Sequence, residues 1–554
     1  MFDEQVVLGL NRTVDASVCL LGSRSLLCSV QKERLTGRKH DGGAVGDVRD
    51  IYLKRIPEMQ TKIDLVVECY ASDTEAQKLE EYHAELVDHL SFRETPRIVQ
   101  ISHHFAHLYS AFFLSGFKEA AVMIIDFQGS YVKDFSERWP VPVNAGPDWL
   151  EVGSFYKTDH TGTTCIGKQL WDGDPNRPVG LGAFYSYLTT TVFPGLGNEG
   201  KMMGLAPYGN PDALGLPPLI VEGEKVFIPD EWRKVLRAPG RFGHFQDNSG
   251  SFEECADLAA AGQKCFEDAL LKLAAWLHEQ TGSFNVCFAG GTALNCVANG
   301  RLLRESKFKN VFIPPSPHDG GTALGCSIYG LLEGLGLHRD LAWVNDFTGS
   351  EPSYSGLEAF LKHEEFEFAQ PPDLIAAMVE LLDAGKVVGL FQGRSELGPR
   401  ALGHRSILAD PRQLALKARI NAHVKGREWF RPLAPVVLEH KAAEYFVIDR
   451  PVPFMQYAVD VRPEYQTVLP AITHVDGTAR LQTVSLRDDA FLFALLSAFE
   501  SRTGIGVLLN TSFNGKNEPI VETPREAIEC FAATDIDVLS IPPFLIFKSN
   551  ATAS

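Results

Sequence analysis

Apolar runs alternate with amphipathic segments along most of the chain. Short runs of β-branched and other apolar residues, bounded by turn residues, predict strands, and longer segments with helical periodicity predict helices. Two runs at 6–10 and 16–21 are joined by a short polar turn and predict a hairpin. Further strands are expected at 63–69, 120–125, 284–289, 310–313 and 387–391, and helices at 103–115, 257–281, 373–384 and 489–501. Because strands alternate with helices, the pattern predicts an α/β fold with a partly parallel sheet.

One polar, turn-rich stretch interrupts this alternation. Between about residue 335 and residue 356 the composition shifts to a polar, turn-rich stretch that includes residues 345–356, which is typical of a domain boundary. We therefore predict one domain at 1–345, a linker at 346–356 and a second domain at 357–554. The length of 554 residues is ample for this division, since domains average roughly 150 residues.

Charge and composition narrow the classes of partner. The chain carries 52 Lys and Arg against 70 Asp and Glu, which gives a net charge of −18. The overall electrostatic field of such an acidic protein disfavours binding to nucleic acid or to an anionic membrane. We find no apolar window of the roughly 18 residues that a bilayer requires, and the acidic start lacks the features of a secretory signal. Ten cysteines without a Cys-x-x-Cys pair indicate reduced thiols, so we expect a cytoplasmic protein.

A histidine motif is the sharpest local signal. His103 and His107 are four residues apart in a predicted helix, so both imidazoles project from one face, whereas His104 points away from it. Asp126 follows one predicted strand and Asp319 follows another. Two imidazoles and two carboxylates suit a first-row divalent ion such as Fe²⁺, Mn²⁺ or Zn²⁺. A helix whose histidines are exposed, or satisfied by local hydrogen bonds, is the alternative that stays open here.

Glycine pairs stand between predicted strands and helices at several points. Gly290 and Gly291 follow a predicted strand and precede Asn295 and a helix start. The segments 318–325 and 126–129 also place glycine in a turn after a predicted strand. Backbone N–H groups at such helix starts suit a phosphate group. Three turns in the order expected of a split actin-like ATPase core favour nucleotide binding. The segment 195–202 is no Walker A loop, because Met202 stands where Ser or Thr must bind magnesium.

Basic residues concentrate in two nearby segments, 392–405 and 425–431. An arginine guanidinium group can donate two parallel hydrogen bonds to two oxygens of one phosphate or carboxylate group. Gly403, Trp429, Phe430 and Pro432 interrupt the charged run, so an ordinary surface helix fits poorly. The pattern favours a pocket for a small anion, with a solvated charged face as the open alternative.

Six ordered motifs extend over essentially the whole chain, at 32–40, 103–107, 198–209, 290–302, 395–408 and 509–514. This set resembles the O-carbamoyltransferases of antibiotic and nodulation-factor biosynthesis, the family that contains the tobramycin and cephamycin enzymes. The resemblance implies an N-terminal actin-like (ASKHA, Kae-like) domain and a C-terminal YrdC-like domain. It also implies that carbamoyl phosphate and ATP form carbamoyl-adenylate in the YrdC-like domain. The Kae-like domain then transfers the carbamoyl group to a hydroxyl of a small natural product.

The resemblance further implies roles for individual residues and the cofactors they bind. The implied metal ligands are His103, His107, Asp126 and Asp319, with Fe²⁺ favoured over Zn²⁺ and Mn²⁺. The implied adenylate site, which binds ATP together with Mg²⁺, contains Lys39, Gly290, Gly291 and Asn295. The implied carbamoyl-phosphate pocket contains Arg400, Lys425, Arg431, Arg480 and Ser512.

The chain departs from the family pattern at two turns. Val14 stands where the family usually has histidine, and Phe127 stands in the Asp-Gly-x-Gly nucleotide turn, so the base that deprotonates the acceptor stays unassigned. The acceptor and the oligomeric state also stay open, with a homodimer as one alternative. For the acceptor pocket we consider the aromatic-rich segment 130–172, whose aromatic residues could equally be packing anchors.

Two competing functions are weighed against O-carbamoyl transfer. A threonylcarbamoyl-type tRNA modification enzyme is disfavoured by the net charge of −18. A non-catalytic ASKHA regulator that binds a nucleotide as a switch leaves the arginine-rich segments unexplained.

Overall fold

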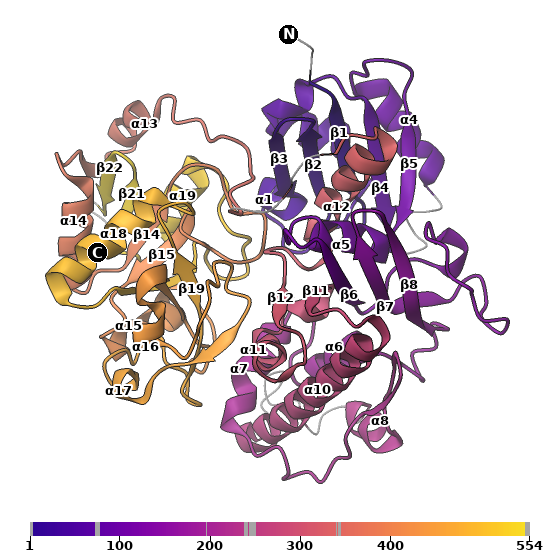
Figure 1. Ribbon diagram of the computed structural model, residues 1–554. Helices are drawn as coiled ribbons and strands as arrows, with labels where there is room; N and C mark the ends of the chain where they lie inside the picture. Colours follow the sequence, from indigo (N-terminus) through magenta and orange to yellow (C-terminus); the bar gives the residue numbers. More distant parts are fainter. Residues whose placement is uncertain are drawn as a thin grey trace. The chain divides into compact units, whose positions relative to one another are not determined.

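The computed structural model describes residues 4–71, 78–195, 197–237, 242, 251–338, 341 and 345–548. The chain divides into two compact units, each drawn with its own helices and sheets in Figure 1. The first unit comprises residues 1–32 and 40–343, and the second comprises residues 33–39 and 344–554. A short segment from near the N-terminus therefore belongs to the second unit.

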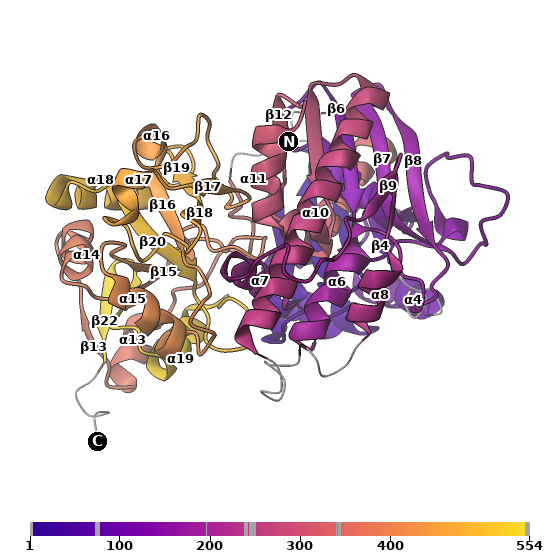
Figure 2. The ribbon, with the colours of Figure 1, turned by 90° about the horizontal axis from the view of Figure 1, so that it is seen from below.

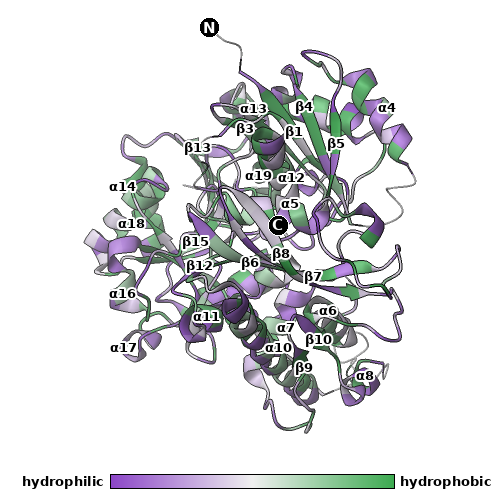
Figure 3. Ribbon diagram, turned by 45° about the vertical axis from the view of Figure 1, so that its right-hand side comes forward, coloured by the Kyte–Doolittle hydropathy of each residue, from purple (hydrophilic) through white to green (hydrophobic). Residues whose placement is uncertain are grey.

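The first sheet of the first unit has the order β3-β2-β1-β4-β5. Its strands are β1 (Val6–Asn11), β2 (Ser17–Gly22), β3 (Leu26–Gln31), β4 (Leu65–Tyr70) and β5 (Ile98–Ser102). The expected hairpin is present as the antiparallel pair β1 and β2, while β4 pairs in parallel with both β1 and β5. Helix α12 (Thr322–Tyr329) packs on β1, β2 and β4, so these strands are buried throughout, as covered strands must be. Figure 3 shows the apolar character of β1 and β4.

The second sheet of the first unit has the order β12-β11-β6-β7-β8. Its strands are β6 (Glu119–Ile125), β7 (Leu150–Asp159), β8 (Gly162–Trp171), β11 (Asn285–Ala289) and β12 (Asn310–Phe312). The long helix α10 (Phe252–Thr281) packs beside α6 (Leu181–Val192), α7 (Glu199–Leu205) and α11 (Cys296–Glu305), as Figure 2 shows. Helix α10 begins five residues before its predicted start because the Ser251 hydroxyl caps it, accepting from the N–H of Glu254.

The second unit is built on an eight-stranded mixed sheet. The order is β13-β22-β21-β14-β15-β20-β16-β19. The strands are β13 (Glu367–Ala369), β14 (Val388–Phe391), β15 (Arg405–Ala409), β16 (Ala434–Leu438), β19 (Gln482–Val484), β20 (Val507–Ser512), β21 (Val538–Ile541) and β22 (Phe544–Phe547). Helices α14 (Leu374–Asp383) and α18 (Ala490–Thr503) pack against each other and join one apolar core with the strands.

The mixed α/β architecture confirms the predicted fold class at this level. Assignment of the units to the Kae-like and YrdC-like folds stays a prediction, as do the domain limits and the linker. Within the described part of the chain, no helix combines the length and the apolar character that spanning a bilayer requires.

Candidate functional site

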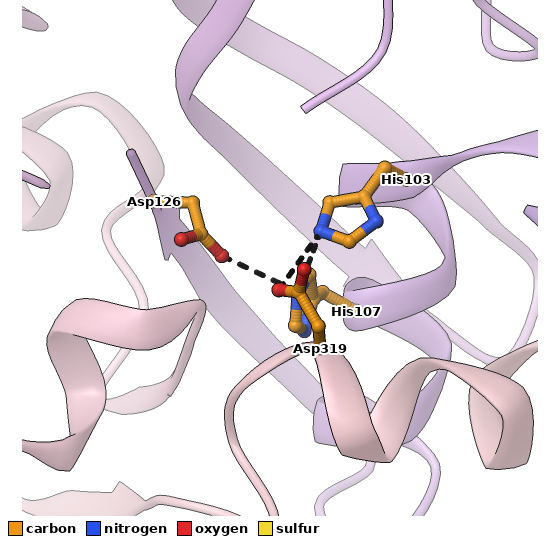
Figure 4. A group of neighbouring side chains, drawn as sticks. All are labelled: His103, His107, Asp126 and Asp319. Carbon is orange, nitrogen blue, oxygen red and sulfur yellow. Dashed lines mark hydrogen bonds and ion pairs between the residues drawn. The ribbon is translucent and has the colours of Figure 1, made fainter. Parts of the chain in front are cut away.

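The histidine motif forms the first turns of helix α5 (His103–Phe112), and it meets two carboxylates. His103 and His107 are both fully buried. Asp126 directly follows β6, and Asp319 begins the short 3-10 turn Asp319–Gly321 that leads into α12. Figure 4 shows that the four side chains converge on one point from three separate elements. His104 lies outside this group, since its Nδ1 is 2.7 Å from the hydroxyl of Ser154.

The distances within this group suit a bound cation. The Nε2 atoms of His103 and His107 are 3.2 Å apart. Asp319 Oδ1 is 3.3 Å from His103 Nε2, and Asp126 Oδ2 is 3.5 Å from His107 Nε2. Four ligands on a tetrahedral ion, at bonds of about 2.1 Å, would lie about 3.4 Å from one another. The donor types and their spacing therefore fit a first-row divalent ion.

The electrostatics of the group also favour positive charge. Burial alone would lower the pKa of His103, but the Asp319 carboxylate outweighs it, and the pKa of His103 is raised well above its usual range. Burial likewise opposes the charged form of His107, whose pKa is raised by Asp126 and Asp319. Burial favours the neutral acid of Asp319, yet the two histidines hold its pKa far below its usual range. The carboxylates thus stabilise a positive charge where the imidazoles meet.

Residues of two turns hold the carboxylates in place. The Asn11 side-chain amide donates to the Asp319 carbonyl oxygen at 3.0 Å, and the Thr13 hydroxyl lies 3.3 Å from Asp319 Oδ2. The N–H of Gly291 donates to Asp126 Oδ2 at 3.0 Å. The hairpin turn and the Gly-Gly turn therefore border the histidine group.

The Gly-Gly turn needs glycine for steric reasons. Gly290 has a φ of +91°, and a Cβ atom there would lie 2.2 Å from the carbonyl oxygen of Ile125. Asn295 is placed further along as the N-cap of α11, where its side chain accepts from the N–H of Ala298. The same side chain exchanges two hydrogen bonds with Gln263. The structure thus brings Gly290 and Gly291 to Asp126, while Asn295 anchors the helix that follows them.

In the second unit, Lys425 and Ser512 are brought together. Lys425 is buried, and its Nζ donates to the Ser512 hydroxyl at 2.9 Å and to the side chain of Asn514. Burial lowers the pKa of Lys425 well below its usual range, and the positive charges of Arg427 and Lys39 add to this effect. Lys39, which closes the segment 33–39, is thereby placed near the same cationic group.

Three arginines add to this cationic group. Burial lowers the pKa of Arg427, and the charges of Arg431 and Arg480 lower it further. Burial also lowers the pKa of Arg431, although Glu428, 3.7 Å away, acts in the opposite direction. Arginines that repel one another in a partly buried site are stabilised by a bound anion. Arg427 is absent from the predicted pocket residues, although it lies within the basic segment 425–431.

Arg400 lies in a different loop from the other predicted pocket residues. The carbonyl oxygen of its neighbour Ala401 accepts a hydrogen bond from Asn510 of β20, the strand that ends at Ser512. Gly398 of the same loop accepts from Arg34 at 2.9 Å, and Arg34 is itself buried. Arg34 therefore ties the segment 33–39, which carries Lys39, to the Arg400 loop.

The aromatic-rich segment 130–172 is divided between core and surface. Phe155, Tyr156 and Trp171 are buried in β7 and β8, where they act as packing anchors. Trp139 and Trp149 are half-buried in the preceding loop. Of these five aromatic residues, only Trp139 and Trp149 are exposed enough to contact an acceptor.

Comparison with known proteins gives two family-model matches that together cover most of the chain. Residues 77–328 match the carbamoyltransferase N-terminus, and residues 379–548 match the carbamoyltransferase C-terminus. Among solved structures, full-length HypF in its phosphate- and nucleotide-bound form has a TM-score of 0.34 and 12% identity, over 61% of this chain and 47% of its own. A TM-score of 0.34 is too low to support an argument about fold or function.

Curated relatives show the same relationship. Nodulation protein NolO of Bradyrhizobium diazoefficiens is 36% identical over 465 residues, which are 82% of this chain and 80% of that protein. The 3'-hydroxymethylcephem-O-carbamoyltransferase of Streptomyces clavuligerus is 35% identical over 366 residues, 63% of this chain and 66% of that enzyme. These matches confirm the resemblance seen in the sequence motifs: the chain belongs to the carbamoyltransferase family.

Proposed function

We propose that the protein is an ATP-dependent O-carbamoyltransferase that forms carbamoyl-adenylate from carbamoyl phosphate and ATP. In this step the P–O bond of carbamoyl phosphate breaks with release of inorganic phosphate, and the carbamate oxygen bonds to the α-phosphorus of ATP with release of pyrophosphate. The observation that carries this proposal is the cationic group of the second unit, formed by Lys425, Arg427, Arg431 and Arg480 beside Ser512. Carbamoyl phosphate is a small dianion, and such a group offsets its charge and fixes its orientation. We assign this pocket, together with Arg400, to carbamoyl phosphate, and the second unit to the YrdC-like fold.

We assign the first unit to the Kae-like ASKHA fold and to the transfer step. Gly290, Gly291 and Asn295 of this unit would bind the adenylate, and Mg²⁺ would accompany ATP. Lys39, which belongs to the second unit, is proposed as an adenylate-binding residue of that unit. His103, His107, Asp126 and Asp319 would hold a divalent ion, for which we favour Fe²⁺ over Zn²⁺ or Mn²⁺. Such an ion supplies Lewis-acid polarisation of a carbonyl or hydroxyl oxygen when bound. The chain's own cationic residues stabilise the phosphate and pyrophosphate charges that develop during adenylate formation.

For the acceptor, we propose a hydroxyl group on a small natural product. The name of the Streptomyces clavuligerus relative specifies a hydroxymethyl group on a cephem as the site of its carbamoylation. A mass-spectrometric screen of hydroxylated natural products, scored for a gain of one carbamoyl group that requires ATP and carbamoyl phosphate, would identify the acceptor class.

Pyrophosphate release tests the proposed donor chemistry. The full-length protein incubated with ATP and carbamoyl phosphate should release pyrophosphate, and omission of carbamoyl phosphate should stop it. Neither bicarbonate nor threonine should be required. A requirement for both would favour the threonylcarbamoyl-type enzyme. Nucleotide binding without any pyrophosphate release would favour the regulator instead.

We predict that anion binding to the cationic group is coupled to proton uptake by Lys425. Its pKa is lowered in the protein without ligand, and a bound dianion stabilises the charged form and raises that pKa. At a pH between the two values the lysine therefore gains a proton on binding, and affinity falls as the pH rises through this window. The measurement is calorimetric titration with inorganic phosphate at a series of pH values, each in buffers of different ionisation enthalpy.

The matched control for this prediction is Lys425→Arg. Arginine stays charged at every accessible pH, so the variant should bind phosphate with little proton uptake. Equal proton uptake in the wild type and in this variant would assign the titration to another group.

A further inference from the structure

Helix α5, which carries both histidines, is capped by side chains from a remote segment. Its N-cap residue is Ser102, but the Ser102 hydroxyl donates to Glu137 at 2.5 Å and does not cap the helix. The N–H groups of residues 102, 103 and 104 instead donate to Ser136 Oγ, Ser130 Oγ and Glu151 Oε1, at 2.6, 2.8 and 3.1 Å. The Ser130 and Glu151 acceptors satisfy the first two amides of the helix, which have no partner within the helix itself.

Glu151 also binds the loop that carries Asp126. Its Oε1 accepts from the N–H of Ser130 at 3.1 Å, and its carbonyl oxygen accepts from the N–H of Gly129 at 2.7 Å. The N–H of Glu151 donates to the carbonyl oxygen of Ser130 at 3.1 Å. The next residue, Val152, accepts from the N–H of Asp126 at 3.1 Å. Glu151 is thus bonded both to the helix that carries two histidines and to the loop that begins at Asp126.

Lys168 holds the Glu151 carboxylate in this position. Both side chains are fully buried, and Lys168 Nζ contacts Glu151 Oε2 directly. The same Nζ is 2.6 Å from Glu137 Oε1 and donates to the hydroxyl groups of Ser154 and Tyr156 at 3.0 and 3.2 Å. A buried ion cluster is a costly way to stabilise a fold, because its charges must be desolvated. Its well-supported use is to impose one arrangement on the surrounding elements.

The backbone leaves no spare room around Glu151. A Cβ atom at Gly129 would lie 2.7 Å from Glu151 Cγ and 2.9 Å from Glu151 Oε1. It would also lie 2.9 Å from Cδ2 of His104, in the first turn of α5. Gly129 therefore allows the close approach of the loop, the Glu151 carboxylate and the helix.

We propose that Glu151, clamped by Lys168, is a positioning residue that sets the separation between the two histidines and Asp126. This inference rests on the proposed metal centre. The two histidines lie on α5 and Asp126 lies on the loop after β6, and a single carboxylate bonds to both of these elements. Loss of that link changes the spacing of the donor atoms without removing any donor, so metal affinity falls although all four ligands remain.

The experiment compares Glu151→Gln with the matched control Glu137→Gln. Both substitutions remove one carboxylate from Lys168. In Glu151→Gln the single amide oxygen can accept either from Lys168 or from the N–H groups of residues 104 and 130, but not from both sides, so the clamped link is broken. Glu137 accepts from Lys168 and from the hydroxyls of Ser102 and Tyr156, not from an α5 amide. Affinities of the metal-stripped full-length protein for Zn²⁺ and Co²⁺ are measured by competition with a chelator. Glu151→Gln should lose roughly 10- to 100-fold in affinity, the usual effect of removing a partner that orients metal ligands. Glu137→Gln should stay within about threefold of the wild type.

A spectroscopic signature separates positioning from general stability. At saturating Co²⁺ the visible absorption bands report ligand geometry, so they should change in Glu151→Gln and match the wild type in Glu137→Gln. Thermal unfolding of the metal-free variants should show similar losses of stability for both. Gly129→Ala, which keeps every charge but crowds Glu151, should weaken metal binding in the same direction. If Glu151→Gln does not fold, the metal affinity of Gly129→Ala tests the positioning role instead.

The opposing outcomes are distinct. Equal metal affinities in the two glutamine variants, or an unchanged Co²⁺ spectrum in Glu151→Gln, would overturn the positioning role while leaving the metal centre in place. Failure of the wild-type protein to bind any divalent ion would overturn the metal centre itself, and the inference with it.

Discussion

Substitution of His107 by alanine is expected to abolish metal binding and carbamoyl transfer while carbamoyl-phosphate breakdown continues. The variant loses one of four ligands, and the Asp126 and Asp319 carboxylates then repel each other without the full counter-charge. The loss of metal affinity should exceed the roughly 10- to 100-fold that follows removal of an outer partner. The cationic group around Lys425 belongs to the second unit and keeps all of its residues, so donor breakdown should persist at least in part.

Two assays on this one variant provide the measurement: phosphate release from carbamoyl phosphate, and product formation with an acceptor. The control is His278→Ala, a histidine substitution in α10 of the same unit, which should leave both activities unchanged. Equal loss of both activities in a His107→Ala protein that is still folded by circular dichroism would contradict the division of the two steps. Full transfer activity without bound metal would contradict the ligand assignment.

Removal of an arginine from the proposed carbamoyl-phosphate pocket should have a comparably large effect on the first step. Arg431→Ala and Arg400→Ala each delete a charge-assisted contact to a dianion, at a cost of about 2–3 kcal/mol. Pyrophosphate release that depends on carbamoyl phosphate should therefore fall by about 30- to 150-fold in each variant. Steady-state assays at fixed ATP, with the fold verified by circular dichroism, provide the measurement.

Arg412→Ala is the matched control in the same unit. Arg412 pairs with Asp383 and Asp410, each through a contact of 2.8 Å or less, and lies outside the proposed pocket. Its substitution should leave pyrophosphate release close to the wild-type rate. Unchanged release in both Arg431→Ala and Arg400→Ala would place the carbamoyl-phosphate site elsewhere.

Local features of the sequence determined much of the fold and part of the site. The four-residue spacing of His103 and His107 places both imidazoles on one face of α5 wherever that helix packs. The hairpin at the N-terminus follows from two apolar runs and the polar turn between them, and all three lie close together in the sequence. The ordered motifs identify the family because each is a contiguous stretch of residues that can be recognised without any knowledge of contacts.

Only the tertiary structure decided which distant residues support those motifs. Glu151 and Lys168 lie in β7 and β8 and carry no motif, and their role depends on the pairing of these strands and on the approach of the 126–130 loop. Arg34 and Lys39 join the second unit although most of it lies more than three hundred residues further along the chain. Hydrogen bonds and charge interactions act over a few ångströms in space and not along the sequence. Which residues share such a neighbourhood is therefore set by how the sheets and helices pack.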